Sequence, residues 1–171
     1  GSHIGTVIQT PENNIISLPY NYYKGRGIKT DVTAFIRISK EIKKLKAIAD
    51  IQYRNIGYLI SGTDNDLQKL NYVISYNFLN PKFGLQYQLH NRHTLSFYTG
   101  YGHKEPERNE IIQSKNNVKY EEVLDVELGY TFSKSKTKIN ANLFWMNYTN
   151  QLVLSGNIND VGAFYKTNVP K

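Results

Sequence analysis

Apolar and polar residues alternate along most of the chain. In the first run the even positions from Ile28 to Ile38 are mostly apolar and the odd positions are mostly polar, with Phe35 as an exception. This period of two predicts a β-strand with one apolar and one polar face. The pattern recurs five more times, so strands are predicted over residues 28–40, 44–56, 71–89, 94–102, 122–132 and 137–154. A further strand is expected to begin near Tyr165.

The third predicted strand changes its pattern part-way. Apolar residues occupy even positions from Tyr72 to Phe78 and odd positions from Phe83 to Leu89. The change falls at Asn80-Pro81. A β-bulge at the proline would produce such a switch, and we expect one there.

Short and long connections alternate between the predicted strands. Polar turns are expected at 40–44, 90–93 and 133–136, and longer polar loops at 4–27, 56–70, 102–121 and 155–164. Long two-faced strands joined in this way are typical of outer-membrane barrels, whereas strands of soluble sheets average about 5–6 residues. We therefore predict an all-β protein: an antiparallel up-and-down meander of about six to seven long strands, forming a segment of a transmembrane β-barrel.

The composition excludes several kinds of site and a helical membrane protein. The chain has 171 residues, 21 Lys and Arg against 14 Asp and Glu, and no Cys, which excludes disulfides, thiolate metal sites and Cys nucleophiles. No apolar run approaches the ~18 residues of a transmembrane helix. Gly1-Ser2-His3 is typical of a cleaved expression tag and is excluded from the fold. Residues 4–27 are interpreted as an extracellular-type loop, and residues 28–171 as a partial β-barrel domain.

Tyrosine is unusually frequent, at 14 of 171 residues. Several tyrosines fall near the ends of the predicted strands, namely Tyr53, Tyr58, Tyr72, Tyr76, Tyr101 and Tyr130. A Tyr ring can face acyl chains while its hydroxyl reaches headgroups, so these residues are interpreted as an aromatic girdle. The alternative is that Tyr simply favours strands.

Several stretches resemble TonB-dependent outer-membrane receptors. They are Phe78-Leu-Asn-Pro-Lys-Phe-Gly-Leu85, Ser96-Phe-Tyr-Thr-Gly-Tyr-Gly-His-Lys-Glu-Pro-Glu-Arg108, Glu127-Leu-Gly-Tyr130, Leu143-Phe-Trp-Met-Asn-Tyr-Thr-Asn-Gln-Leu152 and Thr167-Asn-Val-Pro170. The resemblance implies a large barrel of about 22 strands with a plugged lumen. It also implies an outer-membrane location, lipid contact, and import of a scarce ligand such as an iron–siderophore, haem or a cobalamin. The TonB complex would act through a plug that these residues do not contain, so this segment alone is not expected to transport.

The resemblance places ligand capture in the long loops and the upper wall. Within Tyr20-Asn-Tyr-Tyr-Lys-Gly-Arg-Gly27, three tyrosines lie beside two cations and flexible glycines. Aromatic faces and cations suit an anionic, aromatic metal chelate. The candidate ligand-binding residues are therefore Tyr20, Tyr22, Tyr23, Lys24 and Arg26, followed by His103, Lys104 and Arg108. A girdle that extends into the loop is the alternative for the tyrosines.

Catalytic and metal sites are weakly supported. His90 and His93 flank a turn, with no carboxylate cluster nearby. Nucleophilic catalysis would need Ser, His and an orienting partner, but His93 and Ser96 lie by a short turn, where polar residues need no catalytic explanation. His103 with Glu105, Glu107 and Glu110 could bind a metal, although a solvated loop is favoured. We expect no enzyme, no cofactor and no resident metal.

Two further expectations concern partners. Lys and Arg collect in the turns and on polar strand faces rather than along one aromatic track, so no nucleic-acid partner is expected. The competing interpretation of the whole chain is a soluble antiparallel β module that binds a lipid or an adhesin partner. An isolated segment with uncovered apolar faces is expected to form a strand-paired or face-to-face dimer.

Overall fold

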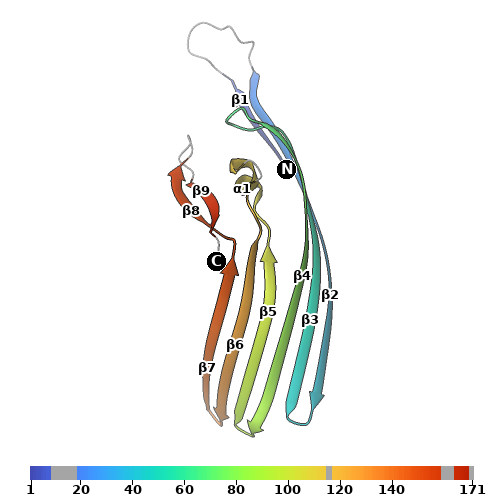
Figure 1. The fold of residues 1–171 in the computed structure, drawn as a ribbon, viewed down its shortest axis with the longest axis vertical. Coiled ribbons are helices and arrows are strands. Elements are labelled where there is room, and N and C mark those ends of the chain that lie inside the picture. Colours follow the sequence, from blue (N-terminus) through green and yellow to red (C-terminus); the bar gives the residue numbers. More distant parts are fainter. Residues whose placement is uncertain (9–18, 115–116, 159–163, 170–171) are drawn as a thin grey trace.

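The computed structural model describes residues 1–8, 19–114, 117–158 and 164–169, and strands dominate it (Figure 1). Seven antiparallel strands form one sheet in the order β1-β2-β3-β4-β5-β6-β7, each paired with its neighbour in sequence. Their bounds are β1 Ser2–Val7, β2 Tyr20–Ile42, β3 Leu45–Thr63, β4 Lys69–His90, β5 His93–Lys104, β6 Glu121–Lys134 and β7 Thr137–Thr149. The predicted all-β, antiparallel up-and-down architecture is confirmed.

A separate hairpin and one short helix complete the described part. The hairpin pairs β8 (Gln151–Ile158) with β9 (Phe164–Val169), and α1 (Arg108–Gln113) lies between β5 and β6. The strand predicted to run from 137 to 154 is therefore two strands, separated at Asn150, whose φ of 54° turns the chain. β9 corresponds to the strand expected near Tyr165. No helix in the described ranges is long and apolar enough to cross a membrane.

The segment predicted as a loop before residue 28 contains strands. β2 begins at Tyr20, because residues 20–26 pair with β1 on one side and residues from Lys24 onward pair with β3 on the other. β1 includes two residues that the sequence interpretation had assigned to a tag, Ser2 and His3. Part of the expected loop, residues 9–18, lies outside the described residues.

The lower half of the sheet has two chemically distinct faces. The apolar face carries Ile36, Ile38, Ala49, Ile51, Phe83, Leu85, Phe97, Leu128, Leu143 and Trp145. The polar face carries Arg37, Asp50, Lys82, Tyr98, Asp125, Glu127 and Asn142. Two-residue turns at 43–44, 91–92 and 135–136 lie together at the lower end of Figure 1. The β5–β6 connection, residues 105–120, leaves from the upper end (Figure 1), as a long connection of such a barrel does. The β3–β4 loop there, residues 64–68, is shorter than the loop expected at 56–70, because β3 continues to Thr63 and β4 begins at Lys69.

The expected β-bulge at Asn80-Pro81 is wrong. β3 and β4 keep one unbroken register from Leu45↔Tyr87 to Thr63↔Lys69, and Pro81 pairs with Ile51 within it. The apolar residues therefore change face: below this level they belong to the apolar face, and above it Tyr72 to Phe78 belong to the other face. The change occurs because the upper part of that second face is covered by protein rather than by solvent.

The buried core lies in this upper part. Its members are Ile56, Tyr58, Ile60, Leu70, Phe78, Ile111 and Val118, with Tyr72, Ile74, Tyr76, Ile112 and Leu152 packed around them. Strands β3 and β4 supply one side, and α1 with the segment before β6 supplies the other. A capping box between Glu107 and Glu110 starts α1.

The structure contradicts the girdle interpretation for three of the six tyrosines. Tyr53 and Tyr130 lie on the apolar face and are 45% and 37% exposed. Tyr58 is 7% exposed within the core, and Tyr72 and Tyr76 pack against that core. The latter three are core residues because the 105–120 connection covers their face.

Candidate functional site

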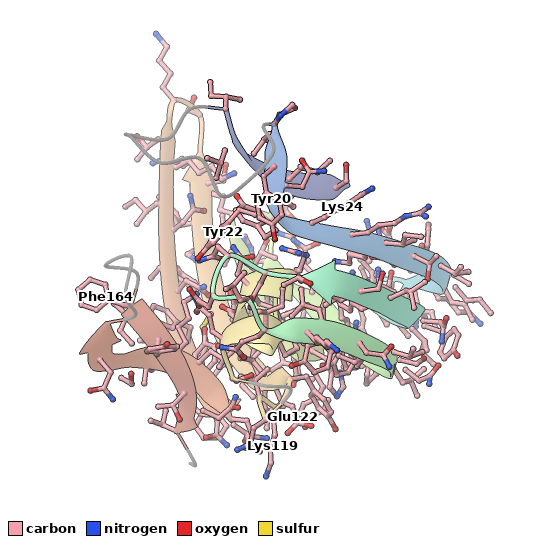
Figure 2. The ribbon with its side chains drawn as sticks, turned by 90° about the horizontal axis from the view of Figure 1, so that it is seen from above. Tyr20, Tyr22, Lys24, Lys119, Glu122 and Phe164 are labelled. Atoms are coloured by element: carbon pink, nitrogen blue, oxygen red, sulfur yellow. The ribbon has the colours of Figure 1, made fainter. Side chains whose placement is uncertain are left out.

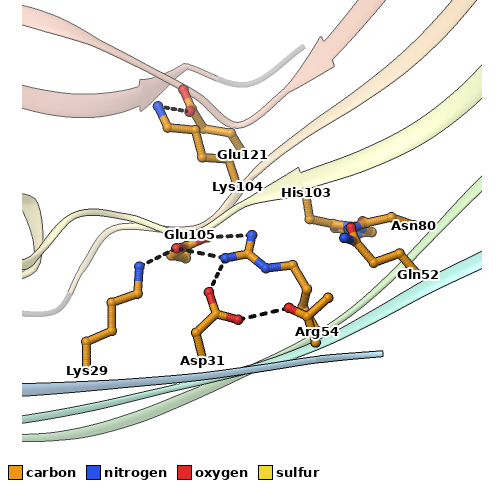
Figure 3. Close-up of polar contacts among 10 residues, drawn as sticks. Lys29, Asp31, Gln52, Arg54, Asn80, His103, Lys104, Glu105 and Glu121 are labelled. Atoms are coloured by element: carbon orange, nitrogen blue, oxygen red, sulfur yellow. Dashed lines mark hydrogen bonds and ion pairs between the residues drawn. The ribbon is translucent and has the colours of Figure 1, made fainter. Parts of the chain in front are cut away.

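The connection from β5 to β6 is held against the upper sheet by a charged cluster. Glu105 accepts a hydrogen bond from Lys29 at 2.6 Å and lies 3.4 Å from Arg54, which also binds Asp31 at 2.5 Å (Figure 3). Its side chain is only 10% exposed. The cluster therefore ties β2 and β3 to a segment about 50 to 75 residues further along the chain.

The charges in this cluster stabilise one another's ionised forms. The hydrogen bond to Glu105 raises the pKa of Lys29, and burial opposes that effect. Burial alone would raise the pKa of Glu105, but the hydrogen bond from Lys29 and the positive charge of Arg54 lower it overall. Both groups are therefore charged at neutral pH.

His103 lies in an aromatic environment next to this cluster. Its ring stacks on Phe78 with centroids 5.0 Å apart and contacts Tyr101 and Tyr120 edge-on or tilted. Nδ1 is 2.7 Å from the side-chain oxygen of Asn80. Burial lowers the pKa of His103, and Glu122, 3.6 Å from Nε2, opposes that shift.

The metal site considered for His103, Glu105, Glu107 and Glu110 is not assembled. Glu105 faces Lys29 and Arg54, whereas Glu110 caps α1 and binds Lys166 at 2.6 Å. Within the described ranges, no group of three or more His, Cys, Asp or Glu is placed to hold a metal ion.

A cavity of about 330 Å³ opens beside α1 at the upper end of the sheet. Its lining includes Tyr23 from β2, Arg108 and Asn109 from α1, and Asp64 from the β3–β4 loop. The volume is at the lower end of the range for small-molecule sites. The polar groups on its wall are donors and acceptors from five separate parts of the chain: β1, β2, the β3–β4 connection, α1 and β9.

Arg108 reaches this cavity across two glycines of β2. A Cβ placed on Gly27 would lie 3.0 Å from Nε of Arg108, and one on Gly25 would lie 3.3 Å from its terminal nitrogen. Nε is buried and has no hydrogen-bond partner among the described residues. The glycines, interpreted from the sequence as flexible, instead leave space for a guanidinium that lies against the strand.

The structure brings together only two of the eight predicted ligand residues. Tyr23 and Arg108 both line the cavity. Tyr20, Tyr22, Lys24 and Arg26 are exposed and do not line it, because strand alternation sends the side chains of Lys24 and Arg26 away from Gly25 and Gly27. His103 packs in the aromatic cluster, and Lys104 pairs with Glu121 at 3.1 Å. Seen from above, the labelled β2 residues and Lys119 with Glu122 lie on opposite sides (Figure 2).

Several cavity residues were missed by the sequence interpretation. Asp64, Asn65, Asp66 and Gln68 come from the short β3–β4 loop, and Asn109, Gln113 and Tyr165 come from α1 and β9. Asp64 organises the loop by accepting hydrogen bonds from the backbone of Asp66 and Gln68. The run of polar residues after Thr63 was a usable signal, since Asx turns of this kind hold a loop in one conformation.

The arrangement of long strands, short lower turns and an upper cavity agrees with a comparison to known families. The family model described as TonB dependent receptor-like, beta-barrel matches residues 4–171. The chain belongs to this family. The resemblance noted in the sequence is thereby confirmed, and the family is one of transport receptors rather than enzymes. No curated protein sequence matches the chain significantly.

Solved structures with the same fold are receptors for metals. The FrpB iron transporter from Neisseria meningitidis is 20% identical with a TM-score of 0.62, over 83% of this chain and 21% of its own. The copper transporter OprC is 13% identical with a TM-score of 0.72, over 84% of this chain and 25% of its own. The ferric-catecholate import receptor Fiu from E. coli K12 is 14% identical with a TM-score of 0.66, over 97% and 29%. The chain thus spans between a fifth and three-tenths of their lengths.

Proposed function

We propose that the protein forms part of the wall of an outer-membrane receptor that imports an anionic, aromatic metal chelate. The observation that carries this proposal is the placement of Arg108 and Tyr23 on one upper cavity. A guanidinium binds a carboxylate or catecholate oxygen pair through two parallel hydrogen bonds, and a phenol ring offers an apolar face and a hydroxyl. Iron–siderophore chelates combine these features, and haem and cobalamin remain the alternative scarce cargo.

Three features support the import role. The lower half of the sheet is apolar on one face, as a lipid-facing wall requires. The cavity lies at the end with the long connections, where cargo would arrive. FrpB, OprC and Fiu carry names that specify iron, copper and ferric-catecholate transport. Energised uptake would depend on a plug and the TonB complex, so residues 1–171 alone would not transport.

The test uses two chelates of Ga³⁺ that differ in charge. The tris-catecholate complex is anionic, and the tris-acetohydroxamate complex is neutral. In the full-length natural protein we expect Arg108→Gln to weaken binding of the anionic complex at least ~10-fold, the loss of one charge-assisted pair, with little effect on the neutral one. Tyr23→Ala should weaken both complexes, because it removes the aromatic surface.

Two controls locate the site. Tyr22→Ala and Arg26→Ala change exposed residues that do not line the cavity. We expect both variants to bind the chelates like the natural protein. A larger loss of affinity in these variants than in Arg108→Gln would move the site to the outer side of β2. Equal binding by all four variants would remove the ligand assignment from this end of the chain.

The same apolar face makes a prediction for residues 1–171 in isolation. Leu143, Ile36 and Ile38 are 75%, 70% and 65% exposed, and such large apolar patches associate in water. We propose that the isolated chain pairs through these faces or through its strand edges. Light scattering in detergent-free buffer should give a mass of at least twice 19.7 kDa. A compact monomer would contradict this proposal and would favour the soluble-module interpretation.

A further inference from the structure

The net charge of the protein is concentrated at one end of the sheet. The three short turns and their flanking residues carry eight basic side chains: Lys40, Lys43, Lys44, Lys46, Arg92, Lys134, Lys136 and Lys138. They carry one acidic side chain, Glu41. Their balance of +7 equals the balance of the whole chain, and the remaining 13 basic and 13 acidic residues cancel. The rest of the protein is therefore neutral overall.

These cations are exposed and unpaired within the described part of the chain. All eight are exposed, and none takes part in an ion pair there. At the upper end four cations, Lys29, Arg54, Lys104 and Lys166, bind carboxylates. Charge at the lower end is thus available to a partner outside the chain.

The cationic end directly adjoins the apolar face. In β2 the apolar row continues from Ile36 and Ile38 to Lys40, and in β6 it continues from Leu128 and Tyr130 through Phe132 to Lys134. Lysines in this position can lay their methylene stems along apolar surface and keep the ammonium at its border. All three turns lie at the same level in Figure 1, so the turn cations together with Lys40 and Lys134 form a band along the lower border of the apolar face. Lys46 and Lys138 lie at the same end but on the polar face.

We propose that this band binds the phosphates of anionic phospholipids in the membrane leaflet next to the periplasm. Short turns of outer-membrane barrels face the periplasm, which places the band at the headgroup level of that leaflet. Each Lys or Arg near an anionic surface contributes attraction that decays within a Debye length. The band would therefore fix the height of the barrel in the membrane and enrich anionic lipid around it. This inference rests on the outer-membrane placement proposed above, but not on the identity of the cargo.

The test measures lipid retention by the full-length natural protein. The protein in neutral detergent is mixed with equal amounts of phosphatidylglycerol and phosphatidylethanolamine, and native mass spectrometry counts the lipids that remain bound. The test variant is Lys44→Gln/Lys134→Gln/Lys136→Gln. The control variant, Lys69→Gln/Lys82→Gln/Lys119→Gln, removes three exposed charges away from the short turns. Gln keeps much of the length of Lys, so both variants lose charge with little change in bulk.

The natural protein should retain phosphatidylglycerol in preference to phosphatidylethanolamine. In the test variant we expect the ratio of retained phosphatidylglycerol to phosphatidylethanolamine to fall at least ~10-fold, because three favourable charges are removed. The control variant should keep the ratio of the natural protein. Raising the salt to about 1 M should remove the preference of the natural protein. Equal retention of the two lipids, or an equal loss in both variants, would overturn the inference.

Binding of the anionic Ga³⁺ chelate separates this inference from the proposed import function. The test variant should bind the chelate normally, because its changes lie at the opposite end of the sheet. If the natural protein does not bind the chelate but still prefers phosphatidylglycerol, the cargo assignment alone is wrong. If the natural protein binds the chelate but retains both lipids equally, the lipid-binding band alone is wrong. A protein that stays folded and monomeric without detergent would overturn the membrane placement on which both depend.

Discussion

Nζ of Lys29 lies 2.6 Å from Oε1 of Glu105, although 76 residues separate them in the chain. The bond joins the middle of β2 to the residue that follows β5. Because Glu105 lies within the stretch from Ser96 to Arg108 that resembles the receptor family, this contact gives a structural role to part of that stretch. The role is to hold the β5–β6 connection against the upper sheet, where Arg108 then reaches the cavity.

Replacing Glu105 tests this role. Glu105→Gln would leave the ammonium of Lys29 and the guanidinium of Arg54 without a full counter-charge in a half-buried place. We expect a loss of about 1–3 kcal/mol in the free energy of unfolding, with the loss concentrated in the connection. Hydrogen exchange should therefore speed up in residues 103–114 but not in β6 and β7. Lys104→Gln is the control: that pair is exposed on the lysine side and is worth about 0.2–1 kcal/mol. Equal protection of 103–114 in both variants would refute the tethering role.

His103 makes stability depend on pH. Burial lowers the pKa of His103 below its usual 6.5, so the unfolded chain binds a proton more readily than the folded one. The contribution of neutral His103 is complete above pH 6.5 and is lost as the pH falls through the lower folded pKa. We expect Tm to fall between pH 7.5 and pH 5 more steeply in the natural protein than in His103→Gln. His90→Gln, at an exposed position, should keep the full slope. An NMR titration midpoint for His103 above 6.5 would contradict the prediction.

The upper core contributes to stability independently of the membrane-facing surface. Ile60 is fully buried on β3, whereas Val73 on β4 is 80% exposed. Ile60→Ala removes side-chain volume from a packed cluster and should cost about 2–5 kcal/mol. Val73→Ala should cost no more than about 0.5 kcal/mol, as a surface change. Urea unfolding followed by Trp145 fluorescence would compare the two variants. Similar midpoints would mean that the cluster does not stabilise the sheet.

The alternation of apolar and polar residues predicted the strands of the sheet well, because it depends only on the local geometry of a strand. It failed where a distant segment decides which face is covered. The change of parity at Asn80-Pro81 looked like a bulge because nothing in residues 71–89 indicates that α1 packs over the upper half. The tyrosines divide for the same reason: Tyr53 faces outward and Tyr58 is buried, although both occur on β3 near a predicted boundary.

The candidate site was predicted only in part, since its residues come from separate connections. Tyr23 and Arg108 were identified by residue type, as an aromatic ring and a cation. Their proximity depends on the packing of α1 against β2, which no local pattern encodes. Lys24 and Arg26 have the same chemistry, yet they alternate to the other side once residues 20–27 form a strand rather than a loop.

The contact between Arg108 and Gly27 can be measured as a coupling energy. Gly27→Ala adds a methyl group about 3.0 Å from Nε of Arg108 and 3.1 Å from Cδ, closer than most side-chain contacts allow. We expect the substitution to destabilise the upper sheet in the natural background, because the partly buried guanidinium must move. In an Arg108→Ala background the same substitution should cost little, which gives a coupling energy of about 0.5–3 kcal/mol in a double-mutant cycle. Gly84→Ala is the matched control, since its nearest neighbour is a backbone oxygen 3.8 Å away, and it should show no coupling to Arg108. If Gly27→Ala costs the same with and without Arg108, the glycine is not there to accommodate the guanidinium, and the cavity wall must be held by other contacts.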